Sequence, residues 1–242
     1  MKNASTSALG LDAVPVLQLS GICKSFNIGE SNESEILHNI NLSLMPGEFC
    51  AIIGPSGSGK STLLNTIGLL DRPSSGSLRI HGIETTSMND RELTHLRGHQ
   101  IGFIFQYHHL LSAFSALENV FMPMFGELGF AHKHIVERAS ELLASVGLQP
   151  WLHAQASHLS GGQQQRVAVA RALMMQPALI LADEPTGNLD SKSADTVFEM
   201  LRQVCRINHT AVLFVTHNPL LSARCDRTIQ VIDGVIFEQK SA

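Results

Sequence analysis

The chain lacks any uninterrupted apolar run that approaches the 18 or more residues of a membrane-spanning helix. The segment from Met1 to Val14 is small and polar, with one lysine and no apolar core, so we do not expect a secretory signal there. Residues 1–15 are predicted to form a flexible N-terminal tail. If the protein works at a membrane, we expect it to dock on other chains that cross the bilayer.

Paired cysteines and an excess of basic charge are also missing. The four cysteines are scattered without a C-x-x-C pair, which predicts reduced, partly buried thiols and argues against a disulfide framework or a zinc site. The net charge is −4, which argues against non-specific nucleic-acid binding. With 44% hydrophobic and 16% charged residues in 242, the composition is that of one large globular domain.

Short apolar runs mark the predicted core. Phe49–Ile53, Leu179–Ala182 and Val212–Val215 are continuous enough to be strands buried on both faces, and helical spacing separates them. This alternation predicts an α/β core with mostly parallel strands. Val16–Leu19 is predicted to be a short edge strand, and Ile229–Phe237 a hairpin that turns at an Asp-Gly pair. A mostly helical insertion is predicted from about Leu96 to Ser160.

A phosphate-binding loop follows the first buried run. Gly54–Ser61 fits the pattern G-x-x-x-x-G-K-[ST] and opens an apolar helix. Glycines let backbone N–H groups turn toward phosphate oxygens, and the helix N-terminus adds partial positive charge. We expect Lys60 to reach the β- and γ-phosphates and Ser61 to bind Mg²⁺.

Two carboxylates follow the second buried run. Asp183 is placed for a direct or indirect role at Mg²⁺, and Glu184 is placed to polarise an attacking water as general base. A solvated acidic turn is the alternative explanation for either residue alone. Together with the phosphate-binding loop, the pair predicts nucleotide hydrolysis.

A second glycine-rich turn, Leu159–Gln163, lies about a hundred residues after the first. Ser160 is a plausible N-cap, and the glycines leave N–H groups open to an anion at a helix start. The order and spacing of the two turns resemble the ATP-binding subunits of ABC transporters from about Val16 to Phe237. In that family the second turn, the signature, covers the ATP that a second subunit holds.

The resemblance implies an ABC ATPase domain at 16–237: a P-loop NTPase core with a mostly parallel sheet, an antiparallel β subdomain and a helical subdomain inserted at about 96–160. It implies ATP and Mg²⁺ as ligands. It also implies a homodimer, integral membrane subunits as partners, and no nucleic acid.

The resemblance also implies roles for individual residues of this sequence. Gln106 corresponds to a glutamine that touches Mg²⁺, His217 to a histidine at the γ-phosphate, and Phe26 to an aromatic ring stacked on adenine. Asp190, in the stretch from Asn188, corresponds to a residue at the dimer interface. The catalytic set is then Glu184 and His217, and the metal set is Ser61, Gln106 and Asp183. The expected nucleotide-binding residues are Phe26, Gly54, Pro55, Ser56, Gly57, Ser58, Gly59, Lys60, Ser61 and Thr62. The expected signature residues are Ser160, Gly161, Gly162 and Gln163.

Two stretches are similar to one branch of the family. Glu184–Asp190 resembles the branch that includes lipoprotein-releasing, macrolide-efflux and cell-division ATPases. Phe105–Leu111, followed by Ser115–Val120, looks most like the lipoprotein-releasing ATPase, and in that family this region faces the membrane subunit. This predicts a peripheral protein at the cytoplasmic face of a bacterial inner membrane that powers lipoprotein release toward a periplasmic carrier. Macrolide or peptide efflux, cell division, and a soluble ABC ATPase without a transport role remain alternatives.

Departures from the expected family pattern are also present. They are Ser112-Ala113, Gln164 and Asn218.

Overall fold

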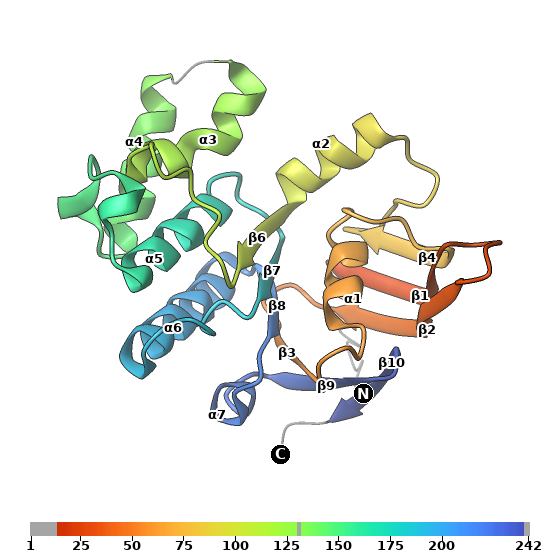
Figure 1. Cartoon of the computed structure of the whole chain (residues 1–242). Coiled ribbons are helices and arrows are strands. Elements are labelled where there is room, and N and C mark those ends of the chain that lie inside the picture. The colour runs from red at the N-terminus through yellow and green to blue at the C-terminus, as the bar shows by residue number, and fades with distance from the viewer. Residues whose placement is uncertain (1–13, 130–131, 240–242) are drawn as a thin grey trace, which may run out of the picture.

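The computed structural model describes residues 14–129 and 132–239, in which strands form two sheets with helices packed around them (Figure 1). The predicted tail at residues 1–15 therefore lies almost entirely outside the described residues. The strands are β1 Leu17–Phe26, β2 Ser34–Leu44, β3 Phe49–Ile53, β4 Ser75–Ile80, β5 Ile83–Glu84, β6 Ile101–Phe105, β7 Leu179–Asp183, β8 Ala211–Val215, β9 Arg227–Ile232 and β10 Val235–Gln239. The helices are α1 Lys60–Ile67, α2 Asp90–Gln100, α3 Ala116–Leu128, α4 Lys133–Ser145, α5 Gly161–Ala172, α6 Ser191–Asn208 and α7 Pro219–Ser222.

The larger sheet carries the parallel core that the apolar runs predict. Within the described residues its order is β10-β9-β3-β8-β7-β6, and every pairing except β9 with β10 is parallel. The carboxyl ends of β3, β6, β7 and β8 therefore lie along one edge, where ligands bind in open α/β sheets. The register places Asp183 opposite both Phe105 and Val215 at that edge.

The smaller sheet corrects one prediction about the N-terminal strand. Its order is β2-β1-β4-β5, all antiparallel, so β1 pairs on both sides. The prediction that Val16–Leu19 is a short edge strand was wrong, because β1 is central and runs on to Phe26. Register shifts between Leu19 and Ile22 interrupt its apolar alternation, which is why the pattern stops short of the strand.

Two apolar clusters cover the faces of the larger sheet, and β3 shows how. Phe49 and Ala51 pack toward α3 to α6, whereas Cys50 and Ile52 face α1 and the smaller sheet. The ring of Phe49 lies 5.2 Å from that of Phe198 on α6, measured between centroids. A strand buried on both faces needs apolar residues at every position, and this is why the sequence marks it clearly.

The segment predicted to be a helical insertion contains a strand as well as helices. The segment from Leu96 to Ser160 begins inside α2 and then enters β6, which belongs to the larger sheet. The helices α3 and α4 follow, with short 3₁₀ turns at Gln149–Trp151 and Ala156–His158, and they lie together with α5 on one side of the sheet (Figure 1). The start was set too early because β6 is a run of only five residues directly after a helix.

The cysteines are free thiols, as predicted. Cys50, Cys205 and Cys225 are buried, and burial raises their pKa to about 12, 11 and 12 respectively. Cys23 is half-buried. In the described part of the chain, no group of three or more His, Cys, Asp or Glu side chains could hold a metal ion on its own.

Candidate active site

The phosphate-binding loop joins β3 to α1, and its backbone is unusual for a chain of L-residues. Gly54, Gly57 and Gly59 have φ values of 151°, 79° and 100°. A Cβ atom at Gly54 would lie 2.1 Å from the carbonyl oxygen of Val231, so only glycine fits against this neighbouring strand. The same hairpin supports the loop again, because the N–H of Gly234 donates to the carbonyl oxygen of Ser58 at 3.0 Å.

Lys60 is the first residue of α1 and is buried. Its Nζ donates to the carbonyl oxygens of Gly54 at 3.0 Å and Pro55 at 2.7 Å. Burial lowers the pKa of Lys60, and the carboxylates of Glu184 and Asp183 act in the opposite direction. The ammonium group therefore sits inside the loop, between its carbonyl oxygens and the two carboxylates.

A cavity of about 400 Å³ opens in front of the loop. It brings together residues from both sheets and from three loops: Phe26, Ile36, Ser56, Gly57, Gly59, Lys60, Ser61, Thr62, Asp183, Glu184 and His217. Of the predicted nucleotide-binding residues, Gly54, Pro55 and Ser58 are not among those that line the cavity. The Oγ of Ser58 is buried and has no hydrogen-bond partner.

Asp183 and Glu184 follow β7 at the edge of the sheet. Burial, reinforced by the Glu184 carboxylate, raises the pKa of Asp183, while Lys60 and His217 oppose that rise. Glu184 adopts φ 46°, a conformation that a non-glycine residue rarely takes, and its N–H donates to the Val215 carbonyl oxygen at 3.2 Å. The strained backbone turns the Glu184 side chain toward His217, whose Nε2 lies 2.7 Å from Oε1 of Glu184.

Gln106 follows β6 at the same edge but does not line the cavity. Its Nε2 donates to Oδ1 of Asn188 at 3.2 Å, and Nδ2 of Asn188 donates back to the Gln106 carbonyl oxygen at 3.4 Å. A Cβ on Gly187 would lie 3.0 Å from that same Nε2, so the glycine makes room for this pair. The structure thus joins the predicted Mg²⁺ glutamine to the stretch that was predicted to reach the dimer interface.

The signature turn, Leu159–Gln163, begins α5. The prediction that Ser160 is the N-cap is confirmed, because its Oγ accepts from the Gln163 N–H at 3.3 Å and Oε1 of Gln163 accepts from the Ser160 N–H at 2.8 Å. None of the residues from Ser160 to Gln163 is among those that line the cavity beside Lys60. In this chain the two glycine-rich turns therefore do not form one site.

Asp190 caps the next helix, α6. Its carboxylate accepts from the N–H groups of Lys192 and Ser193 and from the Ser193 hydroxyl, and these bonds lower its pKa. Ser193 in turn lies against the signature, because a Cβ on Gly162 would come within 2.8 Å of its Oγ. The start of α6 therefore supports the start of α5.

Two of the departures from the family pattern, Gln164 and Asn218, make local hydrogen bonds. Nε2 of Gln164 donates to the carbonyl oxygens of Ala156 and Leu159, which fixes the chain that enters α5. Asn218 caps α7, with Oδ1 accepting from the Leu220 N–H at 2.9 Å. Ser112 and Ala113 are exposed in the loop before α3.

Sequence reasoning missed several contributions to the site. Ile36 lines the cavity, and its only signal was the apolar alternation of β2. The Asp-Gly turn predicted the hairpin of β9 and β10 correctly, but nothing in the sequence placed Gly234 against Ser58. Nothing in the sequence indicated that Gln106 would pair with Asn188.

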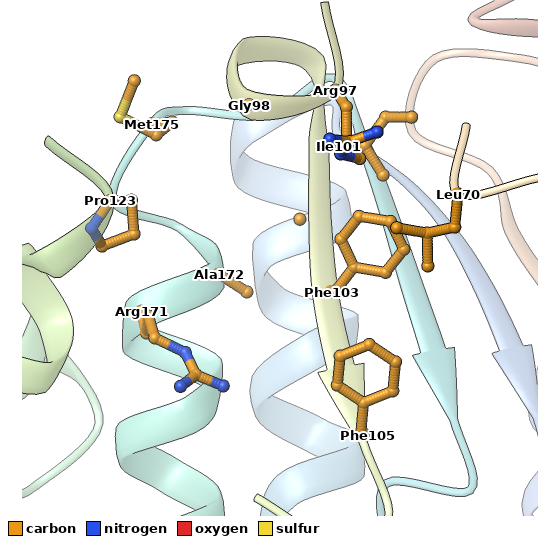
Figure 2. A pocket seen from close by; sticks show the side chains of 11 residues that line it. Leu70, Arg97, Gly98, Ile101, Phe103, Phe105, Pro123, Arg171, Ala172 and Met175 are labelled. Atoms are coloured by element: carbon orange, nitrogen blue, oxygen red, sulfur yellow. The ribbon is translucent and has the colours of Figure 1, made fainter. Parts of the chain in front are cut away.

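A second cavity, also of about 400 Å³, lies near β6 and is mostly apolar. In Figure 2 the ring of Phe103 lies beside Leu70 and the ring of Phe105 lies further along the strand, whereas Pro123, Arg171 and Ala172 lie on the other side of the strand. Gly98 and Met175 complete the rim. This cleft lies between the larger sheet and the helices α3 and α5, directly before the segment that begins at Gln106.

The fold and the first cavity define an α/β nucleotide-binding protein of the P-loop class. Comparison with known families narrows this class, because the sequence pattern of the ABC transporter family matches residues 37–187. The chain belongs to the ABC transporter family and is one of its ATP-binding, ATP-hydrolysing proteins.

Similar proteins of known name cover nearly the whole chain. The lipoprotein-releasing system ATP-binding protein LolD 1 of Rhodopseudomonas palustris is 59% identical over 91% of this chain and 98% of its own length. LolD of Anaeromyxobacter dehalogenans is 52% identical over 93% of each. The macrolide export ATP-binding/permease protein MacB of Azoarcus is 47% identical, but the match spans 97% of this chain and only 35% of MacB.

A solved structure confirms the fold class. The dimeric structure of a bacterial ABC transporter cassette is 40% identical, with a TM-score of 0.84 over 93% of this chain and 99% of that one. Separately, none of the helices in residues 14–129 and 132–239 has both the length and the apolar character needed to span a bilayer.

Proposed function

We propose that this chain is the ATPase subunit of a transporter that releases lipoproteins from a bacterial inner membrane toward a periplasmic carrier. Relatives named as lipoprotein-releasing system ATP-binding proteins match at 46–59% identity over 90% or more of the chain, and they are of similar length. The protein would lie at the cytoplasmic face of the membrane, bound to integral membrane subunits. The lipoprotein would be handled by those subunits and would not touch this chain.

The single observation that carries the two-chain mechanism is the absence of the signature from the cavity beside Lys60. The phosphate-binding loop and the signature turn each present a helix N-terminus, but within one chain the two do not face the same cavity. Two copies related by a two-fold axis supply the missing half reciprocally, because such an interface places the same pair of surfaces together twice. ATP then favours the closed dimer because only that state touches its phosphates from both sides.

In the hydrolytic step, Lys60 would exchange its bonds to Gly54 and Pro55 for bonds to the β- and γ-phosphates. Glu184 would accept the proton of the attacking water, and His217, 2.7 Å from Glu184 here, would hold the carboxylate and contact the γ-phosphate. Phe26, which is 39% exposed at the end of β1, is available to stack on the base. Phosphate loss removes the bridge between the chains and opens the dimer.

The residues present fit Mg²⁺, which binds through one or two carboxylates and the phosphates of its substrate. The Ser61 hydroxyl and the Asp183 carboxylate line the same cavity and offer oxygen donors, whereas Gln106 points to Asn188. When bound, the ion would neutralise charge on the β- and γ-phosphates. Gln106 would join this set only by giving up its bond to Asn188.

The cleft of Figure 2 is the surface we assign to the membrane subunit. Phe105, which lines the cleft, is followed two residues later by Tyr107, which is 68% exposed. Movement of a membrane-subunit segment bound in the cleft would shift α3 and α5 relative to the larger sheet. It would therefore act on the start of α5, where the signature lies.

The decisive experiment uses tagged Glu184→Gln protein in its native membranes, trapped with ATP, solubilised gently and analysed for what co-purifies. Loss of the general base should slow hydrolysis by about 10²- to 10⁴-fold while ATP binding persists. The double variant Lys60→Ala, Glu184→Gln is the control, because it should not hold ATP and should not be trapped.

Membrane subunits with few spans and a large periplasmic domain, together with bound lipoprotein, would support lipoprotein release. A single efflux-type membrane protein or a cell-wall hydrolase partner would favour the second candidate, to which the similarity to MacB points. Recovery of no membrane partner would contradict transport. Hydrolysis by Glu184→Gln at the wild-type rate would contradict the role of Glu184.

A further inference from the structure

The segment from Gln106 to Leu111, which we call the post-β6 segment, is attached to the signature helix at several points. Nη1 of Arg171 on α5 donates to the His109 carbonyl oxygen at 2.7 Å, and Nη2 donates to the His108 carbonyl oxygen at 2.9 Å. Directly before the segment, Nε2 of Gln165, also on α5, donates to the carbonyl oxygen of Phe105, the last residue of β6, at 3.3 Å. Figure 2 shows Arg171 facing the end of β6 where Phe105 lies.

One of these contacts reaches the signature turn itself. Nε2 of His108 lies 2.9 Å from the carbonyl oxygen of Gly161, the first residue of α5, across 53 positions of sequence. Because a carbonyl oxygen only accepts, the imidazole must donate through Nε2–H. Both the neutral form with the proton on Nε2 and the cationic form can do this. The ring is half-buried, whereas Tyr107 beside it is open to a partner.

We infer that His108 is a positioning residue whose bond to the Gly161 carbonyl oxygen holds the signature turn in register with the post-β6 segment. The inference rests on the proposed function, in which Gly161 and Gly162 cover the nucleotide of the partner chain. His108 touches no substrate. It fixes the turn that does, and it links that turn to the exposed Tyr107.

Two substitutions of His108 by an amide test whether the side chain must be long enough to donate to Gly161, since both amides are polar. In His108→Gln the side-chain N–H lies as many bonds from Cα as Nε2 of histidine, so it can still donate to Gly161. In His108→Asn the amide is one bond shorter and loses the contact. His134→Asn is the matched control, because His134 is exposed on α4, where its ring stacks on His132.

The variants are made in the Glu184→Gln background, and two quantities are measured for each. The first is binding of a fluorescent ATP analogue to the dilute, monomeric chain. The second is the dissociation constant of the ATP-bound dimer by analytical ultracentrifugation. We expect His108→Asn to weaken the dimer by about three- to ten-fold, the range for losing one hydrogen bond, with nucleotide binding unchanged. His108→Gln and His134→Asn should stay within two-fold of the parent.

His108→Asn and His108→Gln are also made in the chain that retains Glu184, so that ATP turnover can be measured. The turnover rate should fall three- to ten-fold in His108→Asn and recover in His108→Gln. Equal dimer constants for the two amides would overturn the inference, and so would weakened ATP binding by the monomer. If the Glu184→Gln parent itself does not dimerise with ATP, the proposed two-chain site fails and the inference fails with it.

Discussion

The phosphate-binding loop and the signature turn are both glycine-rich starts of helices, but their glycines serve different purposes. In the loop, Gly54, Gly57 and Gly59 adopt positive φ, and a Cβ at Gly54 or Gly59 would press on neighbouring strands of the same chain. In the signature turn, neither Gly161 nor Gly162 has a positive φ, and both belong to α5. The shape of the first turn depends on contacts with the rest of the fold. The second turn is an ordinary capped helix start, and its glycines leave the backbone there uncovered by side chains.

This difference shows how one site can be divided between two chains. The loop rests on the hairpin of β9 and β10, where Val231 packs against Gly54 and the Gly234 N–H bonds to Ser58. The signature turn is held by the capping bonds between Ser160 and Gln163, by the neighbouring start of α6 and by His108. Substitutions should therefore separate effects on folding from effects that appear only when two chains meet.

The largest effect on the isolated chain is expected for Gly54→Ala. The added Cβ would meet the Val231 carbonyl oxygen at 2.1 Å, and φ 151° is closed to alanine. We expect the free energy of unfolding to fall by at least about 3 kcal/mol, as measured by urea denaturation. A loss below about 1 kcal/mol would show that the loop tolerates a side chain there and would remove the contrast with the signature.

A smaller effect, on ligand binding and not on folding, is expected for Lys60→Ala. Hydrogen bonds to a charged group contribute about 1.5–3 kcal/mol, so ATP affinity should fall by roughly 10- to 100-fold in a calorimetric titration. Lys133→Ala is the control, since Lys133 is exposed on α4, where it pairs with Glu137. Unchanged affinity in Lys60→Ala would contradict the phosphate-binding role of the loop.

The smallest effect on the isolated chain is expected for Gly161→Ala. Its Cβ would find only the Leu189 side chain, at 3.9 Å, so the free energy of unfolding should stay within about 0.5 kcal/mol of the parent. ATP-dependent dimerisation and hydrolysis should nevertheless fall, because a methyl group now stands on the surface that faces the partner. Gly162→Ala provides the contrast, since its Cβ would press on Ser193 at 2.8 Å and should destabilise the isolated chain as well. Wild-type hydrolysis by Gly161→Ala would mean that this surface does not meet a nucleotide.

The sequence predicted the parts of the fold in which neighbouring residues carry the information. The strands β3, β7 and β8 were recognisable because each is apolar at nearly every position, and the Ser160 cap was recognisable from the polar residue before a helix. The length of β1 was not recognisable, because bulges break its alternation. Contacts between loops were also out of reach: Gln106 meets Asn188 across 82 positions, and the parallel pairing of β6 with β7 brings their loops together.

The hairpin of β9 and β10 also bears on how the protein is made. Gly54 is synthesised early, yet the Val231 carbonyl oxygen that it packs against and the Gly234 N–H that holds Ser58 emerge from the ribosome about 180 residues later. The loop therefore takes its final form only when almost the whole domain has been translated. A nascent chain stalled before the hairpin would carry every residue that touches phosphate and still lack the wall that shapes them.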